Sequence, residues 1–217
     1  MKKMIAGALA LGFVATPALA HHPLGGLPMV TFLHGLLSGI GHPLLGFDHL
    51  LFVIGVGVGA LYTGFPRLAP LAYIVAMLAG CVMMSLGEGL PVKEAVIALS
   101  LIVVGGFVLS GRAMNATTAM VLFAVFGLFH GSAFGDSIVG QEGGVGSKVL
   151  FGYLIGLGVL QYLIAVASGL VVQHGLKATQ AGAVHARLAG AMIAGAGVLL
   201  TLEQVEGALF SLMNIAV

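Results

Sequence analysis

The sequence predicts an all-α fold, a polytopic membrane helical bundle with six transmembrane helices after a cleaved signal peptide. Of the 217 residues, 59% are hydrophobic and 7% are charged, whereas a soluble domain carries about 25% charged residues. The mean hydropathy is +1.15, and six segments are apolar over the roughly 20 residues that a membrane helix needs. The 35 glycines and the absence of tryptophan indicate closely packed helices.

The same composition excludes several classes of protein. A formal net charge of +1 lacks the clustered basic surface of a nucleic-acid-binding protein. A single cysteine cannot form an internal disulfide framework or a cysteine-rich zinc module. The partner that remains is the lipid bilayer.

The first 20 residues have the pattern of a secretory signal peptide. Lys2 and Lys3 precede an apolar stretch over residues 4–15, and Ala18-Leu19-Ala20 resembles a signal-peptidase site. We therefore expect a signal peptide at 1–20 and one transmembrane domain over 21–217. The alternative is an uncleaved first membrane helix.

Apolar stretches of membrane-spanning length predict the six helices in chain order. A shorter stretch at 27–41 predicts an outer interfacial or partly inserted helix, and the last 13 residues, 205–217, predict a short amphipathic tail. The predicted spans are 43–62, 68–88, 92–111, 116–135, 148–172 and 186–203.

Loop charge predicts the orientation. If the mature N-terminus is periplasmic, the inner loops are 63–67, 112–115 and 173–187. These loops contain basic residues and no acidic residue, as the positive-inside rule requires. We therefore expect a multi-pass protein of the inner membrane, with short loops and its chemistry within or at the edge of the bundle.

The first polar cluster lies at the start of the first predicted span. Asp48 and His49 are costly at membrane depth, and a bound cation would compensate because carboxylate and imidazole are metal ligands. On a straight helix His42 would lie about 10 Å from His49, so a shared ion requires a bend, which we expect at Pro43 and Gly46. The alternative is that His42 caps the helix and Asp48 pairs with a distant basic residue.

A second cluster closes the fourth predicted span with His130 and Asp136. The alternating topology places this end of the span on the same side of the membrane as the first cluster. We therefore expect the two clusters to converge on one metal site near the outer face. Alone, His130 would be interpreted as a hydrogen-bonded core histidine.

Both clusters carry a family resemblance. HPLLGFDHLL at 42–51 resembles the His-Pro-x-x-Gly-x-Asp-His signature of the HupE/UreJ family of nickel/cobalt permeases, and FHGSAFGD at 129–136 is similar to that family's Phe-His-Gly-x-Ala-x-Gly-Glu stretch. The second stretch has Asp136 where the family usually has glutamate, a side chain that is one methylene longer. The resemblance assigns functional importance to His42, Asp48, His49, His130 and Asp136.

The resemblance also implies a function. It implies uptake of Ni²⁺, with Co²⁺ as the second candidate, to supply the maturation of a metalloenzyme such as hydrogenase or urease. The ion would be the transported substrate, and no prosthetic cofactor is expected.

A sulfur-rich stripe in the second predicted span offers a secondary site. Met77, Cys81, Met84 and Glu88 recur on one helical face, and sulfur ligands ending in a carboxylate could guide a borderline-soft ion. Packing is the more common role of such a methionine stripe.

Three histidines near the outer surface are further candidates. His21, His22 and His34 could capture a metal ion before transfer, although terminal histidines often have no function. For Glu94 we favour a helix-dipole role over a role in ion entry.

Two other functions remain as alternatives. An intramembrane zinc-dependent metalloenzyme would use the same His and Asp residues with an open coordination position, but the chain has no H-E-x-x-H helix. A retinal-based protein would need a lysine inside a span, and each lysine lies in the signal or near a span end. The chain also has no Walker motif, so we expect a secondary permease and not an enzyme.

Overall fold

A computed structural model describes residues 28–139 and 146–213, and all regular elements within these ranges are helices. The predicted signal peptide, together with His21 and His22, lies outside the described residues. The described elements are α2 (Phe32–Leu45), α3 (Phe47–Leu61), α4 (Ala69–Ser85), α5 (Lys93–Ser110), α6 (Ala116–Val139), α7 (Ser147–Leu170), the π-helical turn η1 (Val171–Gly175) and α8 (Val184–Leu212).

The chain bends sharply between α2 and α3. Gly46 has extended backbone angles, φ −89° and ψ 95°, and the two helices meet at 83°. The Gly46 amide donates to the carbonyl of His42 and closes the last turn of α2. The predicted bend is therefore confirmed at Gly46, whereas Pro43 lies inside α2.

Part of the predicted span count is confirmed. Four helices within the described residues are long and apolar enough to cross a membrane, or five if the bent α2–α3 pair counts as one span. They are α5, α6, α7 continued by η1, and α8. The sixth span would be α4, an apolar helix of 17 residues, and six spans therefore stay a prediction.

Two predicted boundaries are wrong. The span at 68–88 ends early because α4 stops at Ser85 and Gly87 adopts a positive φ of 91°, a conformation that glycine takes without steric cost. The tail predicted from residue 205 onward is not separate, because α8 runs without a break to Leu212. Apolar residues on both sides of the predicted boundary allow one continuous helix.

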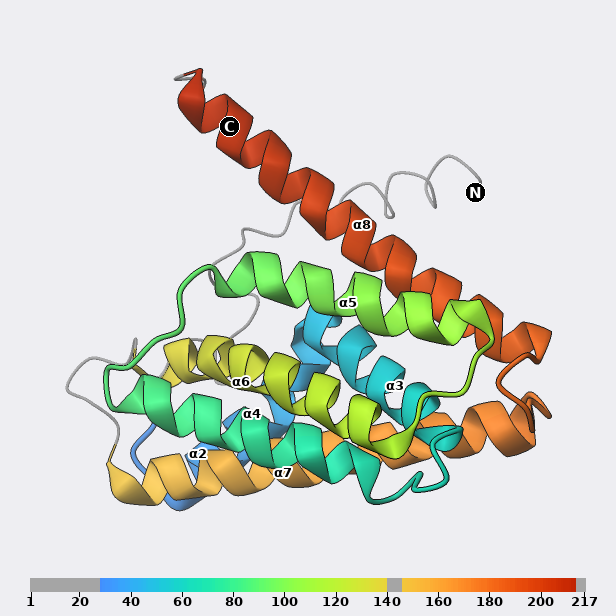
Figure 1. Cartoon of the computed structure of the whole chain (residues 1–217). Helices are drawn as coiled ribbons and strands as arrows, with labels where there is room; N and C mark the ends of the chain where they lie inside the picture. The colour runs from blue at the N-terminus through green and yellow to red at the C-terminus, as the bar shows by residue number, and fades with distance from the viewer. Residues whose placement is uncertain (1–27, 140–145, 214–217) are drawn as a thin grey trace, which may run out of the picture.

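Helices that are distant in sequence pack in pairs: α4 lies along α6, α2 along α7 and α5 along α8 (Figure 1). Glycines permit this contact, since a Cβ atom on Gly80 would lie 2.1 Å from the carbonyl oxygen of Leu128 on α6. The helix α3 contacts α5 and α7, and its first turn reaches the site described below.

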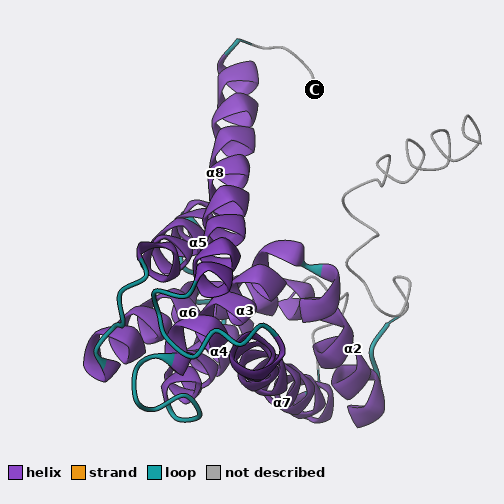
Figure 2. Cartoon of the chain, turned by 90° about the vertical axis from the view of Figure 1, so that its right-hand side faces the viewer, coloured by secondary structure: helices purple, strands orange, loops and turns teal. Residues whose placement is uncertain are grey.

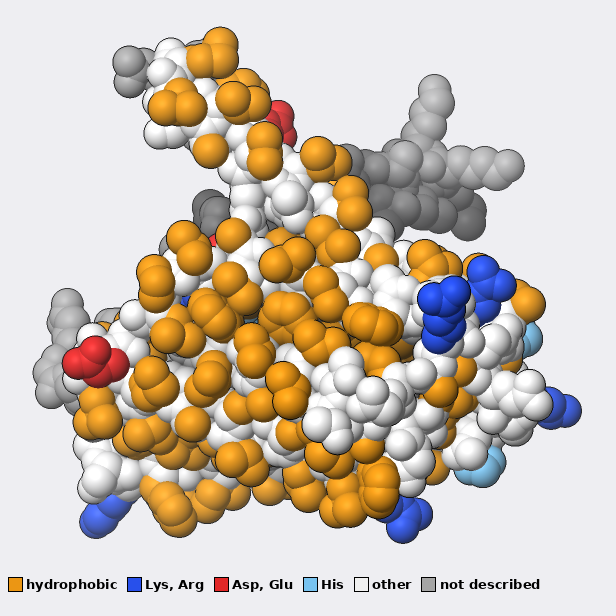
Figure 3. Space-filling model, viewed as in Figure 1, with side chains coloured by type: hydrophobic (Ala, Val, Ile, Leu, Met, Phe, Trp, Pro, Cys, Tyr) orange, Lys and Arg blue, Asp and Glu red, His pale blue; other side chains and the backbone are white. Residues whose placement is uncertain are grey.

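Many large hydrophobic side chains are exposed on the helices, as expected for a protein that faces lipid. Hydrophobic side chains cover most of the face in Figure 3, and the few charged groups lie near its margins. The C-terminal half of α8 projects away from the other helices (Figure 2). The buried residues of α8 all lie within the first 14 positions of the helix, and the last of them is Gly197.

Candidate functional site

Two histidines from distant segments meet in the core. His49 lies in the first turn of α3 and His130 lies in α6, and their Nδ1 atoms are 2.7 Å apart. His49 is 7% exposed and His130 is fully buried. The structure thus brings together one residue from each predicted cluster through a direct hydrogen bond.

Aromatic rings enclose the histidine pair on both sides. The ring of Phe52 stacks on His130 with centroids 4.2 Å apart and 20° between the planes. The ring of Phe134 lies 4.2 Å from that of His49. These contacts fix the planes of both imidazoles and keep water from the nitrogen atoms that face each other.

Ser100 of α5 determines where the imidazole protons lie. Its hydroxyl oxygen is 2.6 Å from the carbonyl oxygen of Ile97 and 2.9 Å from Nε2 of His130. The carbonyl can only accept, so the hydroxyl proton points to Ile97 and the Ser100 oxygen accepts from Nε2–H of His130. The other nitrogen of a neutral His130, Nδ1, must then be an acceptor.

The same reasoning extends to His49. Because Nδ1 of His130 accepts, Nδ1 of His49 donates, and Nε2 of a neutral His49 carries a lone pair. That Nε2 atom lies 3.9 Å from Oδ2 of Asp48. An imidazole lone pair and a carboxylate oxygen at this separation are arranged to attract a cation.

A cavity of about 240 Å³ adjoins this pair of acceptor atoms. It is lined by residues from α2, the bend, α3, α5 and α6. Three of its residues, Asp48, Glu94 and Asp136, carry carboxylates, and His42 and His49 supply imidazoles. The cavity therefore gathers four of the five residues of the main predicted site in one polar space, and His130 lies behind His49.

Asp136 lies at this cavity with a partner of its own. Its carboxylate forms an ion pair with the ammonium group of Lys93, the first residue of α5. The two side chains are 44% and 20% exposed, so the pair lies at the edge of the bundle. A cation that used Asp136 would have to compete with this lysine.

His42 reaches the cavity from the last turn of α2. Its ring meets Phe134 edge-on, with centroids 5.3 Å apart. Within the described ranges, no three His, Cys, Asp or Glu side chains are close enough together to hold a metal ion. Binding by more than the Asp48–His49 pair would require these side chains to move.

The secondary candidates are dispersed. Met77 and Cys81 are fully buried, and the sulfur of Met77 accepts from the amide nitrogen of Gln161 at 3.8 Å, so these residues belong to the helix packing. Glu88 lies beyond the end of α4 and is exposed, so the continuous helical stripe through Met84 to Glu88 is wrong. His34 lies at the start of α2, where its Nδ1 accepts from the backbone of Val30.

The sequence reasoning missed two residues and underrated a third. Ser100 gave no signal beyond being a hydroxyl in an apolar span, and Lys93 gave none beyond its place at a helix start. Glu94, which we assigned to the helix dipole, lines the cavity. A helical projection of α5 could have placed Lys93 and Ser100 on one face, because seven residues make nearly two turns.

Taken together, apolar helices of membrane-spanning length and a buried histidine pair beside a carboxylate-lined cavity define a multi-pass membrane protein with a polar site among its helices. Comparison with known proteins identifies the family of this protein. The model of the family described as "HupE / UreJ protein" matches residues 9–200, and the chain belongs to this family.

One curated relative supports this membership. Protein HupE of Rhizobium leguminosarum bv. viciae is 31% identical over 195 residues, which cover 88% of this chain and 94% of that protein. No solved structure matches the chain.

Proposed function

We propose that this protein is a permease that takes up Ni²⁺, with Co²⁺ as the second candidate, across the inner membrane. The observation that carries the proposal is the hydrogen bond between His49 and His130, which directs Nε2 of His49 toward Asp48 and the cavity. Membership of the HupE/UreJ family supports the same function. Imidazole and carboxylate are ligands that both ions accept.

The ion would bind between Nε2 of His49 and the carboxylate of Asp48. Two protein ligands suit a transported ion, because a site must bind strongly enough to select and weakly enough to release. Water would complete the coordination shell in the polar cavity. His42, Glu94 and Asp136 line that cavity and would attract the ion or replace some of its water.

His130 would position the ligand and not bind the ion itself. Its two nitrogen atoms already bond to His49 and Ser100. A ligating histidine usually donates its other ring N–H to such a partner, which fixes the orientation of the ring. This role differs from the ligand role that the sequence predicts for His130.

The driving force would be the membrane potential. A charge that crosses 100 mV gains about 2.3 kcal/mol, so a divalent cation gains about twice that value. The metal would then supply the maturation of a nickel enzyme such as hydrogenase or urease, as the family resemblance implies.

Metal uptake by proteoliposomes tests the proposal. We expect the wild-type protein to transport Ni²⁺ or Co²⁺ in preference to Zn²⁺, and both His49→Asn and Asp48→Asn to reduce uptake to the background of empty vesicles. His185→Gln is the control, because His185 is an exposed histidine in the first turn of α8 and does not line the cavity. Wild-type uptake by both site variants, at equal amounts of folded protein, would refute the assignment.

A further inference from the structure

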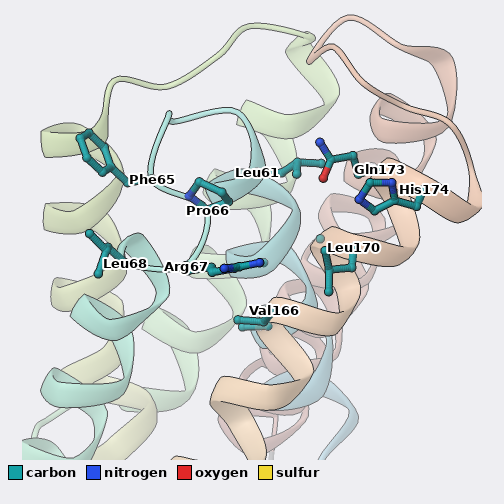
Figure 4. Close-up of a pocket in the computed structure, with 12 residues that line it drawn as sticks. Leu61, Phe65, Pro66, Arg67, Leu68, Val166, Leu170, Gln173 and His174 are labelled. Carbon is teal, nitrogen blue, oxygen red and sulfur yellow. The ribbon is translucent and has the colours of Figure 1, made fainter.

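A second cavity lies at the opposite end of α3 from Asp48 and His49. It has a volume of about 400 Å³ and is enclosed by the end of α3, the segment that leads into α4, the last turns of α7 and the turn η1. Figure 4 shows Arg67 extending from that segment toward α7, with Gln173 and His174 nearby. The remaining lining is mostly apolar, including Phe65, Leu170 and their neighbours.

Arg67 supplies a positive charge to this cavity. Within residues 28–139 and 146–213, no carboxylate lies within 4.0 Å of the guanidinium group of Arg67. The two ion pairs in this part of the chain involve other residues. Gln173 and His174 add polar groups from η1. A guanidinium group recognises phosphate or carboxylate oxygens, and it would repel a metal cation.

An apolar groove lies next to this cavity along the bundle. It has a volume of about 540 Å³ and lies between α4 and α7. Ile155, Val159 and Tyr162 line the groove, whereas Val166 and Leu170 line the Arg67 cavity. These residues are spaced by three or four positions, so both spaces lie along one face of α7.

A hydrogen bond joins the walls of the two spaces. Tyr162 lines the groove, and its hydroxyl donates to the carbonyl oxygen of Arg67 at 3.2 Å. On α7 the groove is lined from Phe151 to Leu163, a helical rise of about 18 Å, which exceeds half of the roughly 30 Å hydrocarbon thickness of a bilayer. The cationic pocket thus borders an apolar groove that is long enough for the acyl chain of one leaflet.

We propose that this surface binds one anionic phospholipid. The phosphate lies beside Arg67, Gln173 and His174, and one acyl chain occupies the groove between α4 and α7. The apolar groove favours a lipid over a free anion, because inorganic phosphate would leave that groove without an occupant. The site is separate from the proposed metal site and does not depend on its function.

Lipid binding to the purified protein, measured by native mass spectrometry, tests the charge. We expect phosphatidylglycerol to bind at least about tenfold more tightly than phosphatidylcholine, and Arg67→Gln to abolish that preference. Arg112→Gln is the matched control, since Arg112 is an exposed arginine after α5 that does not line the cavity. An equal loss in both variants would show unspecific attraction by surface charge and overturn the proposal.

A second pair of variants tests the groove. Val159 and Val121 are each 56% exposed, but only Val159 lines the groove. We expect Val159→Trp to weaken phosphatidylglycerol binding about tenfold and Val121→Trp to leave it unchanged. Two results together would refute the lipid site and identify a site for a free anion. They are displacement of phosphatidylglycerol by millimolar inorganic phosphate and wild-type lipid binding by Val159→Trp.

Discussion

Ser100 has a chemical role in the site although it does not face the cavity. Its single hydroxyl proton is committed to the carbonyl of Ile97, and this commitment fixes the proton of His130 on Nε2. The proton of His49 is fixed on Nδ1 as a consequence. One buried serine therefore determines that the Nε2 atom of His49, which lies 3.9 Å from Asp48, carries the lone pair of the ring.

Replacement of this serine should weaken metal binding without changing the number of ligands. We expect Ser100→Ala to lower the affinity for Ni²⁺ about tenfold, the lower end of the range for partners that orient a metal ligand. Isothermal titration would measure the affinity, and X-ray absorption would count the coordinated imidazoles.

The control for this prediction comes from the same helix. Ser110→Ala removes an equivalent hydroxyl, which donates to Phe107 at 2.7 Å and contacts no imidazole. We expect wild-type affinity from it. A coordinated imidazole lost in Ser100→Ala would contradict a purely positioning role.

Lys93 should oppose metal capture. Its ammonium group neutralises Asp136 at the edge of the cavity, and a unit charge raises the energy of a divalent ion by about 1 kcal/mol at about 8 Å in water. We therefore expect Lys93→Gln to lower the KM for Ni²⁺ uptake about fivefold, whereas Lys93→Arg keeps the wild-type value. An increase in KM for Lys93→Gln would mean that the ion pair instead holds α5 and α6 in place.

These residues show how much of the site could be predicted. The motifs gave His49 and His130, because ionisable side chains in apolar segments are conspicuous in a sequence. The motifs did not predict Ser100 or Lys93. A serine, or a lysine at a helix start, acquires a role only from the side chain that packs against it, and the sequence does not show which side chain that is. The roles of individual residues as metal ligands stay predictions.

At the scale of single helices, the apolar pattern predicted most elements and missed their ends. We predicted the bend at Gly46 because His42 and His49 could share an ion only if the helix did not run straight between them. The structure contains this bend. The end of α4 and the length of α8 depend on backbone angles and on packing partners, which hydropathy does not encode. Helix pairing likewise requires contacts between segments distant in sequence.

The pairing of α4 with α6 should depend on Gly80. A Cβ atom there would lie 2.1 Å from the carbonyl oxygen of Leu128, and a backbone oxygen cannot yield without separating the helices. We expect Gly80→Ala to reduce the free energy of unfolding by about 2 kcal/mol, within the range for overpacked cores. Thermal unfolding in detergent, followed by circular dichroism, would measure the change.

Gly106 provides the comparison for this substitution. It also lies inside a helix, but a Cβ atom on it would meet nothing within 4 Å. Gly106→Ala should leave stability unchanged or raise it by up to about 1 kcal/mol, because alanine loses less conformational entropy on folding. Equal destabilisation by both variants would show that glycine acts through the helix backbone and not through the α4–α6 contact.

At the scale of the whole molecule, the two cavities lie at opposite ends of α3. The His49 cavity gathers carboxylates and imidazoles, whereas the Arg67 cavity contains a guanidinium group. In the predicted orientation the acidic end faces outward and the basic end faces inward. The acidic entrance would concentrate cations, while the arginine would hold the bundle against anionic lipid on the inner side.

This arrangement predicts that the accumulation of Ni²⁺ inside vesicles follows the membrane potential. A divalent ion gains about 4.6 kcal/mol at 100 mV, which corresponds to an equilibrium accumulation of about two-thousandfold at 1.4 kcal/mol per tenfold. Proteoliposomes with a potassium diffusion potential set by valinomycin, negative inside, should accumulate Ni²⁺, and abolishing the potassium gradient should bring the internal and external concentrations of free ion to equality. His49→Asn vesicles would provide the background. Accumulation that persists at zero potential and disappears when a pH gradient is collapsed would instead show that protons drive the transport.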